Sequence, residues 1–120
     1  MNRGQCMKRY FIEVTQVSNS LNDWYPRGYQ ESYIRKGAFA AKAEDFFKDP
    51  AFWSNYLLYT SRERAERYMK FMQKNTHEKY WDSSFRIGEI EVNDCGHVIC
   101  HMRDPIMNYN SDTVQSHQYK

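Results

Sequence analysis

Alternating apolar and polar positions predict β-strands at residues 10–17, 85–92 and 97–102. In the first strand, Tyr10, Ile12 and Val14 are expected to share one face. The turn-forming residues 93–96 separate the other two strands, so a hairpin is expected there. A short apolar run over residues 55–59, directly before the capping signal at Thr60, predicts one further strand.

The strand at residues 85–92 contains a change of phase. Phe85 and Ile87 share one face, whereas Ile90 and Val92 share the other, and Gly88 stands between the two pairs. One unpaired residue resets the alternation of a strand. A β-bulge at Gly88 is therefore predicted to direct all four apolar side chains into a single core.

Helical spacing predicts two helices. Residues 38–47 contain four alanines and are expected to form a helix of about three turns. The second helix is expected to begin at a capping box, in which Thr60 accepts from the amide of Glu63. Its apolar stripe recurs at helical intervals at Ala65, Tyr68, Met69 and Met72.

These elements predict one α+β domain, with a small antiparallel or mixed sheet of about four strands and two helices packed on one face. A chain of 120 residues has the usual size of one domain. Residues 1–8 are expected to be a polar leader and 9–102 the domain. Residues 103–120 are polar and aperiodic, and a flexible tail is expected there.

Composition and charge narrow the class of protein. The net charge of +2, with both signs interspersed, excludes a strongly basic nucleic-acid binder and an acidic mimic. Because 17% of the residues are aromatic, the core is expected to consist largely of rings, and some rings are expected at the surface. No stretch approaches the roughly 18 apolar residues of a transmembrane helix. Three cysteines without a framework spacing, and no apolar secretory run, indicate a reducing cytoplasm.

The chain contains one group of residue types that can bind a metal, Cys95, His97, Cys100 and His101. On a strand, His97 and His101 would stand about 13 Å apart, too far to share one zinc ion. Cys100 would point to the opposite face, which also separates it from the adjacent His101 as a thiol and base pair. No metal site and no cofactor is therefore predicted.

No established catalytic sequence motif is present, whether of the GxSxG, HExxH, P-loop or GxGxxG type. His77 with Glu78, or Asp82 with Ser83, offers acid and base groups of the kind that many proteins of this size contain. No catalytic residue is predicted, and the protein is expected not to be an enzyme. A small enzyme or metal-binding protein remains the second alternative.

A segment rich in rings and cations is the first candidate binding surface, and a turn at Tyr25-Pro26-Arg27-Gly28 lies within it. Such residues are enriched at protein interfaces, and they also suit single-stranded nucleic acid. As an alternative, the rings fold back onto the core as the inner face of a hairpin. The candidate residues are Trp24, Tyr25, Arg27, Tyr29, Tyr33, Arg35 and Lys36.

A second candidate surface is basic. Arg67, Lys70 and Lys74 lie on one side of the second predicted helix and could contact phosphates or an acidic patch. A solvated, charged helix face is the alternative interpretation.

The succession of YFIEVT, the turn WYPRGY, LLYTSRERAERYMKFM and FRIGEIEV resembles small open reading frames carried by bacteriophages. The resemblance extends over residues 10–92. It implies an accessory protein for host takeover or anti-defence, one that binds and blocks a host protein or complex such as CRISPR machinery. It assigns no role to any residue. The function expected from the sequence is therefore non-enzymatic binding of a host protein, with a nucleic-acid-binding module as the alternative.

Overall fold

The structure is a computed structural model that describes residues 7–19, 25–76, 80–93 and 97–108. These residues form an α+β domain, as the sequence predicts, and none of their helices is long and apolar enough to cross a membrane. The elements are β1 (Met7–Ser18), β2 (Gln30–Lys36), β3 (Phe39–Lys42), α1 (Ala43–Lys48), α2 (Ser54–Leu57), α3 (Arg62–Asn75), β4 (Trp81–Val92), β5 (Val98–Arg103) and β6 (Met107–Asn108).

The sheet has the strand order β3-β2-β1-β4-β5, and all neighbouring strands are antiparallel. Its two central strands, β1 and β4, pair without interruption from Met7 opposite Val92 to Ser18 opposite Trp81. The short strand β6 continues along the same edge of β4 as β5. The sheet is larger than the four strands expected, because residues 30–36 and 39–42 each supply a strand.

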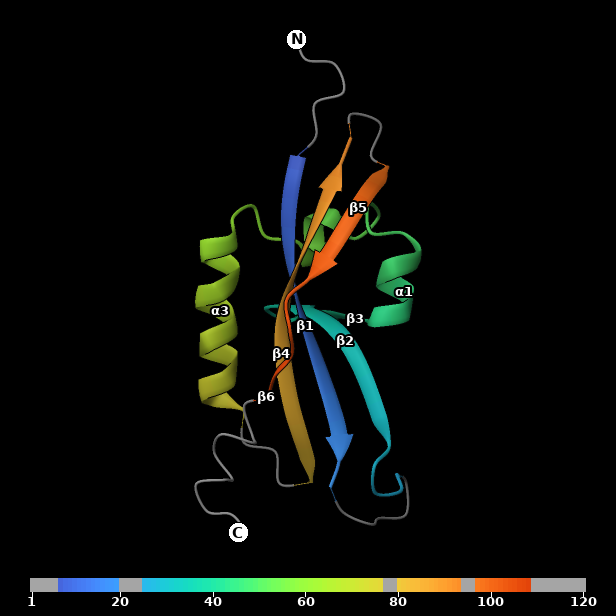
Figure 1. The fold of residues 1–120 in the computed structure, drawn as a ribbon, viewed down its shortest axis with the longest axis vertical. Coiled ribbons are helices and arrows are strands. Elements are labelled where there is room, and N and C mark those ends of the chain that lie inside the picture. Colours follow the sequence, from blue (N-terminus) through green and yellow to red (C-terminus); the bar gives the residue numbers. More distant parts are fainter. Residues whose placement is uncertain (1–6, 20–24, 77–79, 94–96, 109–120) are drawn as a thin grey trace.

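Each face of the sheet carries its own core. On one face, Ala65 and Met69 of α3 pack against β1 and β4. On the other face, Phe46 of α1 and Leu57 of α2 pack around Phe11. Figure 1 shows α3 and α1 on opposite sides of the strands. The expectation that the helices cover one face is therefore wrong.

The phase change at Gly88 has a different explanation from the predicted bulge. The β1–β4 ladder runs through Gly88 without a break, so Phe85 and Ile87 contribute to the α3 core while Ile90 and Val92 contribute to the other. A register shift occurs instead between β4 and β5, at Glu91/Val92. The alternation changes phase because both faces of this strand are buried, each at a different end.

The predicted helix at residues 38–47 is wrong over its first half. Phe39–Lys42 forms β3 and pairs with β2 in a hairpin, in which Gly37 has a φ of +60°. Only Ala43–Lys48 is helical, and its Phe46 is fully buried. Backbone pairing with β2 outweighs the helix propensity of the alanines, which is a small term for each residue.

The strand predicted at residues 55–59 is wrong over its first three residues, because Ser54–Leu57 is a short helix. The extended backbone begins at Leu58, and Tyr59 forms a single bridge with Tyr10. The Tyr59 amide donates to the Tyr10 carbonyl at 2.7 Å, and the Tyr10 amide donates back at 2.9 Å. This bridge fixes the chain immediately before α3.

The second predicted helix is confirmed as α3, but it begins one residue later than the predicted capping box. Ser61 is the N-cap, and its hydroxyl accepts from the Arg64 amide at 3.2 Å. Ala65 and Met69 of the predicted stripe are buried, whereas Tyr68 is exposed. The apolar face of the helix is therefore narrower than its sequence suggests.

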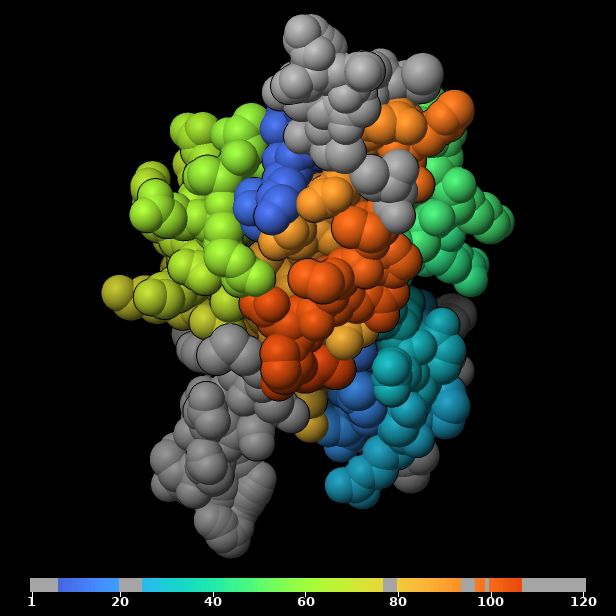
Figure 2. All heavy atoms as spheres, turned by 45° about the horizontal axis from the view of Figure 1, so that its top comes forward, coloured from blue at the N-terminus to red at the C-terminus, as the bar shows by residue number. Residues whose placement is uncertain are grey.

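Residues 103–108 are the described part of the segment expected to be a flexible tail, and they run alongside β4. The Asp104 amide donates to the Ile87 carbonyl at 2.8 Å, and β6 pairs with Ser84 and Phe85. In Figure 2, β5 and the described residues that follow it, up to residue 108, lie between α3 and α1. Residues 109–120 lie outside the described part of the chain, as do residues 1–6 of the expected leader, whereas residues 7–8 begin β1.

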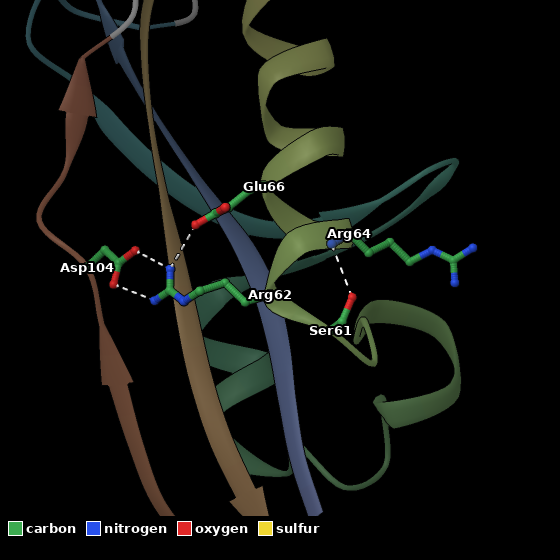
Figure 3. Close-up of polar contacts among 5 residues, drawn as sticks. All are labelled: Ser61, Arg62, Arg64, Glu66 and Asp104. Carbon is green, nitrogen blue, oxygen red and sulfur yellow. Dashed lines mark hydrogen bonds and ion pairs between the residues drawn. The ribbon is translucent and has the colours of Figure 1, made fainter.

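The Asp104 carboxylate connects this segment to α3. It accepts two hydrogen bonds from the Arg62 guanidinium, at 2.9 and 2.8 Å, and Arg62 also lies 3.5 Å from Glu66 (Figure 3). Paired bonds between a guanidinium and a carboxylate set geometry as well as adding energy.

Candidate binding groove along helix α3

The first candidate surface of the sequence is divided between two places. Tyr25, Arg27 and Tyr29 precede β2, whereas Tyr33, Arg35 and Lys36 lie within it. Tyr29 and Lys36 are about 23 Å apart at the usual rise of a strand. Trp24 lies outside the described residues.

The turn before β2 forms one residue later than expected. The Tyr29 amide donates to the Pro26 carbonyl at 3.0 Å, and Gly28, with a φ of +91°, is the third residue of this turn. Tyr25 and Tyr29 then contact each other and Trp81, with ring centroids 4.8 to 6.3 Å apart. This group of rings includes a residue of β4 that the sequence pattern did not associate with it.

The three candidate residues within β2 have different surroundings. Tyr33 packs against the α3 core, and Arg35 is exposed. The Lys36 ammonium donates to the Leu58 carbonyl at 2.7 Å and lies 5.0 Å from the centre of the Tyr59 ring. Lys36 therefore holds the chain before α3 in place.

Two neighbouring cavities border α3. The sheet cavity, of about 330 Å³, has Val14, Ser83 and Phe85 on its strand side and Met72 on its helix side. The hairpin cavity, of about 470 Å³, lies between the β2–β3 hairpin and the N-terminal part of the helix. Gly37 and Tyr68 line both cavities, and we refer to the two together as the α3 groove.

Exposed rings line the α3 groove. They are 42% to 63% exposed, a large fraction for side chains of this size. Phe39 contacts Tyr56, with ring centroids 5.4 Å apart, and Tyr68 stacks on the buried ring of Tyr59, with centroids 5.6 Å apart. The exposed rings are Phe39, Tyr56, Tyr68 and Phe71.

The charge of the α3 groove has one sign. Its described lining residues include the cations Arg35, Lys36 and Arg64. No Asp or Glu is present among the described lining residues. Arg35 is exposed, and its Nε donates to the Gly37 carbonyl at 3.2 Å. Figure 3 shows the Arg64 side chain extending away from Ser61. Two guanidinium groups are thus available to an anionic partner.

Tyr59 lies at the inner wall of the hairpin cavity, where burial raises the pKa of its hydroxyl to about 12 and the neighbouring Tyr68 adds to the shift. The hydroxyl is therefore neutral at physiological pH and does not reduce the positive charge of the groove.

Ser83 lies at the floor of the sheet cavity. Its hydroxyl is buried and has no hydrogen-bond partner within the described residues. The neighbouring Asp82 instead accepts from Asn19 at 2.9 Å. Adjacent residues of a strand point to opposite faces, so Asp82 and Ser83 do not form the acid and base pair considered from the sequence.

The second candidate surface is exposed. Arg67, Lys70 and Lys74 all lie on the outer side of α3. Arg67 and Lys74 follow Arg64 and Phe71 by three residues each, so they border the side of the helix that lines the groove.

The described residues contain no group of three or more metal-binding side chains. His97 and Cys100 are exposed, and His101 stacks on Phe47 at 5.3 Å. Cys95, His77 and Glu78 lie outside the described part of the chain.

Several groove residues were missed from the sequence because their elements were misassigned. The sequence pattern predicts a helix at Phe39 and a strand at Tyr56, whereas Phe39 lies in β3 and Tyr56 in α2. Arg64, Tyr68 and Phe71 recur at helical spacing, which places them on one side of the predicted helix. This spacing could have grouped Arg64 with the two rings from the sequence. No sequence pattern brings Ser83 to this groove, because that depends on the pairing of β1 with β4.

Scans against protein-family models, curated proteins and solved structures return no match for this chain.

Proposed function

We propose that this protein is a non-enzymatic binding protein that uses the α3 groove to hold a partner protein. The observation that carries the proposal is the combination of exposed rings, available guanidinium groups and no described carboxylate in one groove. Aromatic and arginine side chains contribute most of the energy of many protein interfaces, because each buries a large area and keeps a polar contact. The partner is expected to present an acidic surface.

The resemblance to bacteriophage proteins suggests the biological role of this binding, which is to block a host protein. An accessory protein that blocks a host protein needs a binding surface and no chemistry of its own. The α3 groove suits such a role, because its rings are already ordered by contacts such as that between Phe39 and Tyr56. Ordered anchors lose less conformational entropy when a partner binds.

The test is an affinity capture from host lysate with the whole chain, followed by titration calorimetry with the purified partner. Replacing both Phe39 and Tyr56 with Ala is expected to weaken binding at least about 30-fold, in line with the loss of interface anchors. The matched control replaces Tyr25 and Tyr29 with Ala, which removes two contacting rings outside the groove. Equal affinity of the groove variant and the wild type would contradict the proposal.

Single-stranded nucleic acid is the second candidate partner, because bases stack on exposed rings and phosphates pair with arginine. A fifteen-nucleotide dT strand provides the probe. Phosphate-led binding should weaken steeply with added salt, and it should be lost when Arg35 and Arg64 are replaced with Ala. Binding that depends on the groove rings and exceeds that of the captured protein would favour this candidate.

A further inference from the structure

The hydroxyl of Ser83 is buried at the α3 groove and lacks a hydrogen-bond partner among the described residues. Ser83 is 1% exposed. It lies on the strand face that carries Phe85, at the floor of the sheet cavity. An unpaired buried hydroxyl destabilises a protein, and nearly all buried polar groups in proteins have a hydrogen-bond partner. A ligand that supplies a hydrogen-bonding atom would remove this destabilisation.

The register of the strands separates Ser83 from the cation of the same cavity. Val14 pairs with Tyr33 on one side and with Phe85 on the other. Arg35 lies two residues beyond Tyr33 and Ser83 two residues before Phe85, in opposite directions along the sheet. Four strand positions separate the two residues along the sheet, which is about 13 Å at the usual rise of a strand, and Arg35 directly follows Ile34, the last residue of β2 that pairs with β1. One side chain cannot contact both, whereas an extended segment of about five residues can.

The two ends of the sheet cavity also differ in charge. Arg35 makes one end cationic. The other end lies beside the C-terminus of α3, where the helix dipole carries partial negative charge. There Asn75 and Thr76 donate to the carbonyls of Phe71 and Met72, at 2.8 and 2.6 Å. An anion is favoured near Arg35, and a neutral polar group is favoured near Ser83.

We infer that the partner inserts an extended peptide segment into the α3 groove, with an acidic side chain at Arg35 and a neutral hydrogen-bonding side chain at Ser83. The inference rests on the proposed binding of a protein. Met72 lines the same cavity, and its unbranched side chain can move aside to admit the segment. A peptide is favoured over a polynucleotide because phosphates at every step would place charge against the C-terminus of α3.

The experiment pans a display library of random twelve-residue peptides against the full chain. Enriched peptides should carry Asp or Glu four to five positions from Asn, Gln, Ser or Thr. Fluorescence anisotropy with an enriched synthetic peptide should show affinity losses of about tenfold for both Ser83→Ala and Arg35→Ala. Ser83→Ala should cause no further loss when the neutral residue of the peptide is replaced with Ala.

A second readout does not depend on the peptide. Because the Ser83 hydroxyl has no described partner, Ser83→Ala should leave the Tm unchanged or raise it. The control is Ser84→Ala, since Ser84 points to the opposite face and donates to the Thr15 carbonyl at 3.5 Å. That change should leave peptide binding intact.

In the peptide and stability experiments, each of these results would overturn the inference: no enriched peptide, enriched peptides that bind Ser83→Ala as tightly as wild type, or a lower Tm for Ser83→Ala. Displacement of the peptide by a dT strand at physiological salt would also count against it. A captured partner that depends on Phe39 and Tyr56 but is indifferent to Ser83 and Arg35 would overturn this inference and leave the proposed function standing.

Discussion

Gly88 and Phe11 occupy paired positions on the two central strands of the sheet. Glycine has no Cβ, so the Phe11 ring can lie over its backbone and reach Phe46 and Phe47 of α1, with centroids 5.1 and 5.5 Å away. A Cβ at position 88 would overlap the Phe11 ring. At this position a single missing side chain allows β1 to join the core beneath α1.

Gly88→Ala is expected to lower the free energy of unfolding by about 1–3 kcal/mol, because overpacking displaces a fully buried ring. Urea denaturation followed by circular dichroism measures the change. Phe11→Leu combined with Gly88→Ala should cost less than the sum of the two single changes, since the shorter side chain leaves room for the methyl group. A fully additive result would show that the two positions do not compete for space.

Tyr59 predicts a pH dependence of stability. Its pKa is raised to about 12 by burial, above the value of about 10 expected in the unfolded chain. Between these values the unfolded state has lost the proton and the folded state still holds it, so stability falls as pH rises. About 1 kcal/mol should be lost between about pH 9 and pH 11 after allowance for solvent screening. Urea midpoints at the two pH values measure the loss, and Tyr59→Phe should reduce it.

At the scale of elements, hydrophobic patterning located β1, β4, β5 and α3, because each has a clear period and a buried face. It failed for Phe39–Lys42, where alanine favours a helix but the hairpin with β2 determines the structure. It also failed at Gly88, because a bulge and a strand buried on both faces produce the same change of phase. The unbroken β1–β4 ladder and the second helix layer, on the opposite face, distinguish these two cases.

The cap of α3 can be tested with two adjacent hydroxyl residues. Ser61→Ala should lower the free energy of unfolding by about 1 kcal/mol, because the Arg64 amide loses its acceptor. Thr60→Ala is the matched control and should change stability by less than about 0.5 kcal/mol. Urea denaturation of both variants decides between them, and a larger effect at Thr60 would restore the capping box predicted from the sequence.

The contact between Arg62 and Asp104 holds α3 against the segment that links β5 to β6. Both side chains are partly exposed, so Asp104→Ala should cost only about 0.5–1 kcal/mol. The loss should shrink in high salt. Asp45→Ala serves as the control, because the Asp45 pair with Lys48 is longer, at 3.9 Å, and more exposed. Equal effects of the two changes would show that the bidentate geometry adds nothing.

For the whole molecule, the sequence predicted an α+β domain, and it indicated rings and cations as candidate binding residues without showing which of them lie together in the α3 groove. Tyr33 and Arg35 belong to the candidate groove, whereas Tyr25 and Tyr29 lie about a strand length away. The groove depends on the β2–β3 hairpin meeting α3, and no local pattern encodes that contact. The proposed partner-binding function therefore follows from tertiary structure more than from any single segment.

The β1–β4 ladder also affects how fast the protein can fold. Its closest pair in sequence is Ser18 with Trp81, and its most distant is Met7 with Val92. Folding dominated by such non-local pairs is slow, so stopped-flow refolding is expected on the millisecond-to-second scale. Microsecond refolding would contradict this expectation.

During synthesis, β1 leaves the ribosome long before its partner β4. Until Trp81–Val92 has been made, the edge of β1 that will pair with β4 and one side of Phe11 have no native cover. A nascent chain in this state exposes a strand edge that can pair with other chains. The central position of β1 in the finished sheet therefore leaves the growing chain with an uncovered strand edge until β4 has been made.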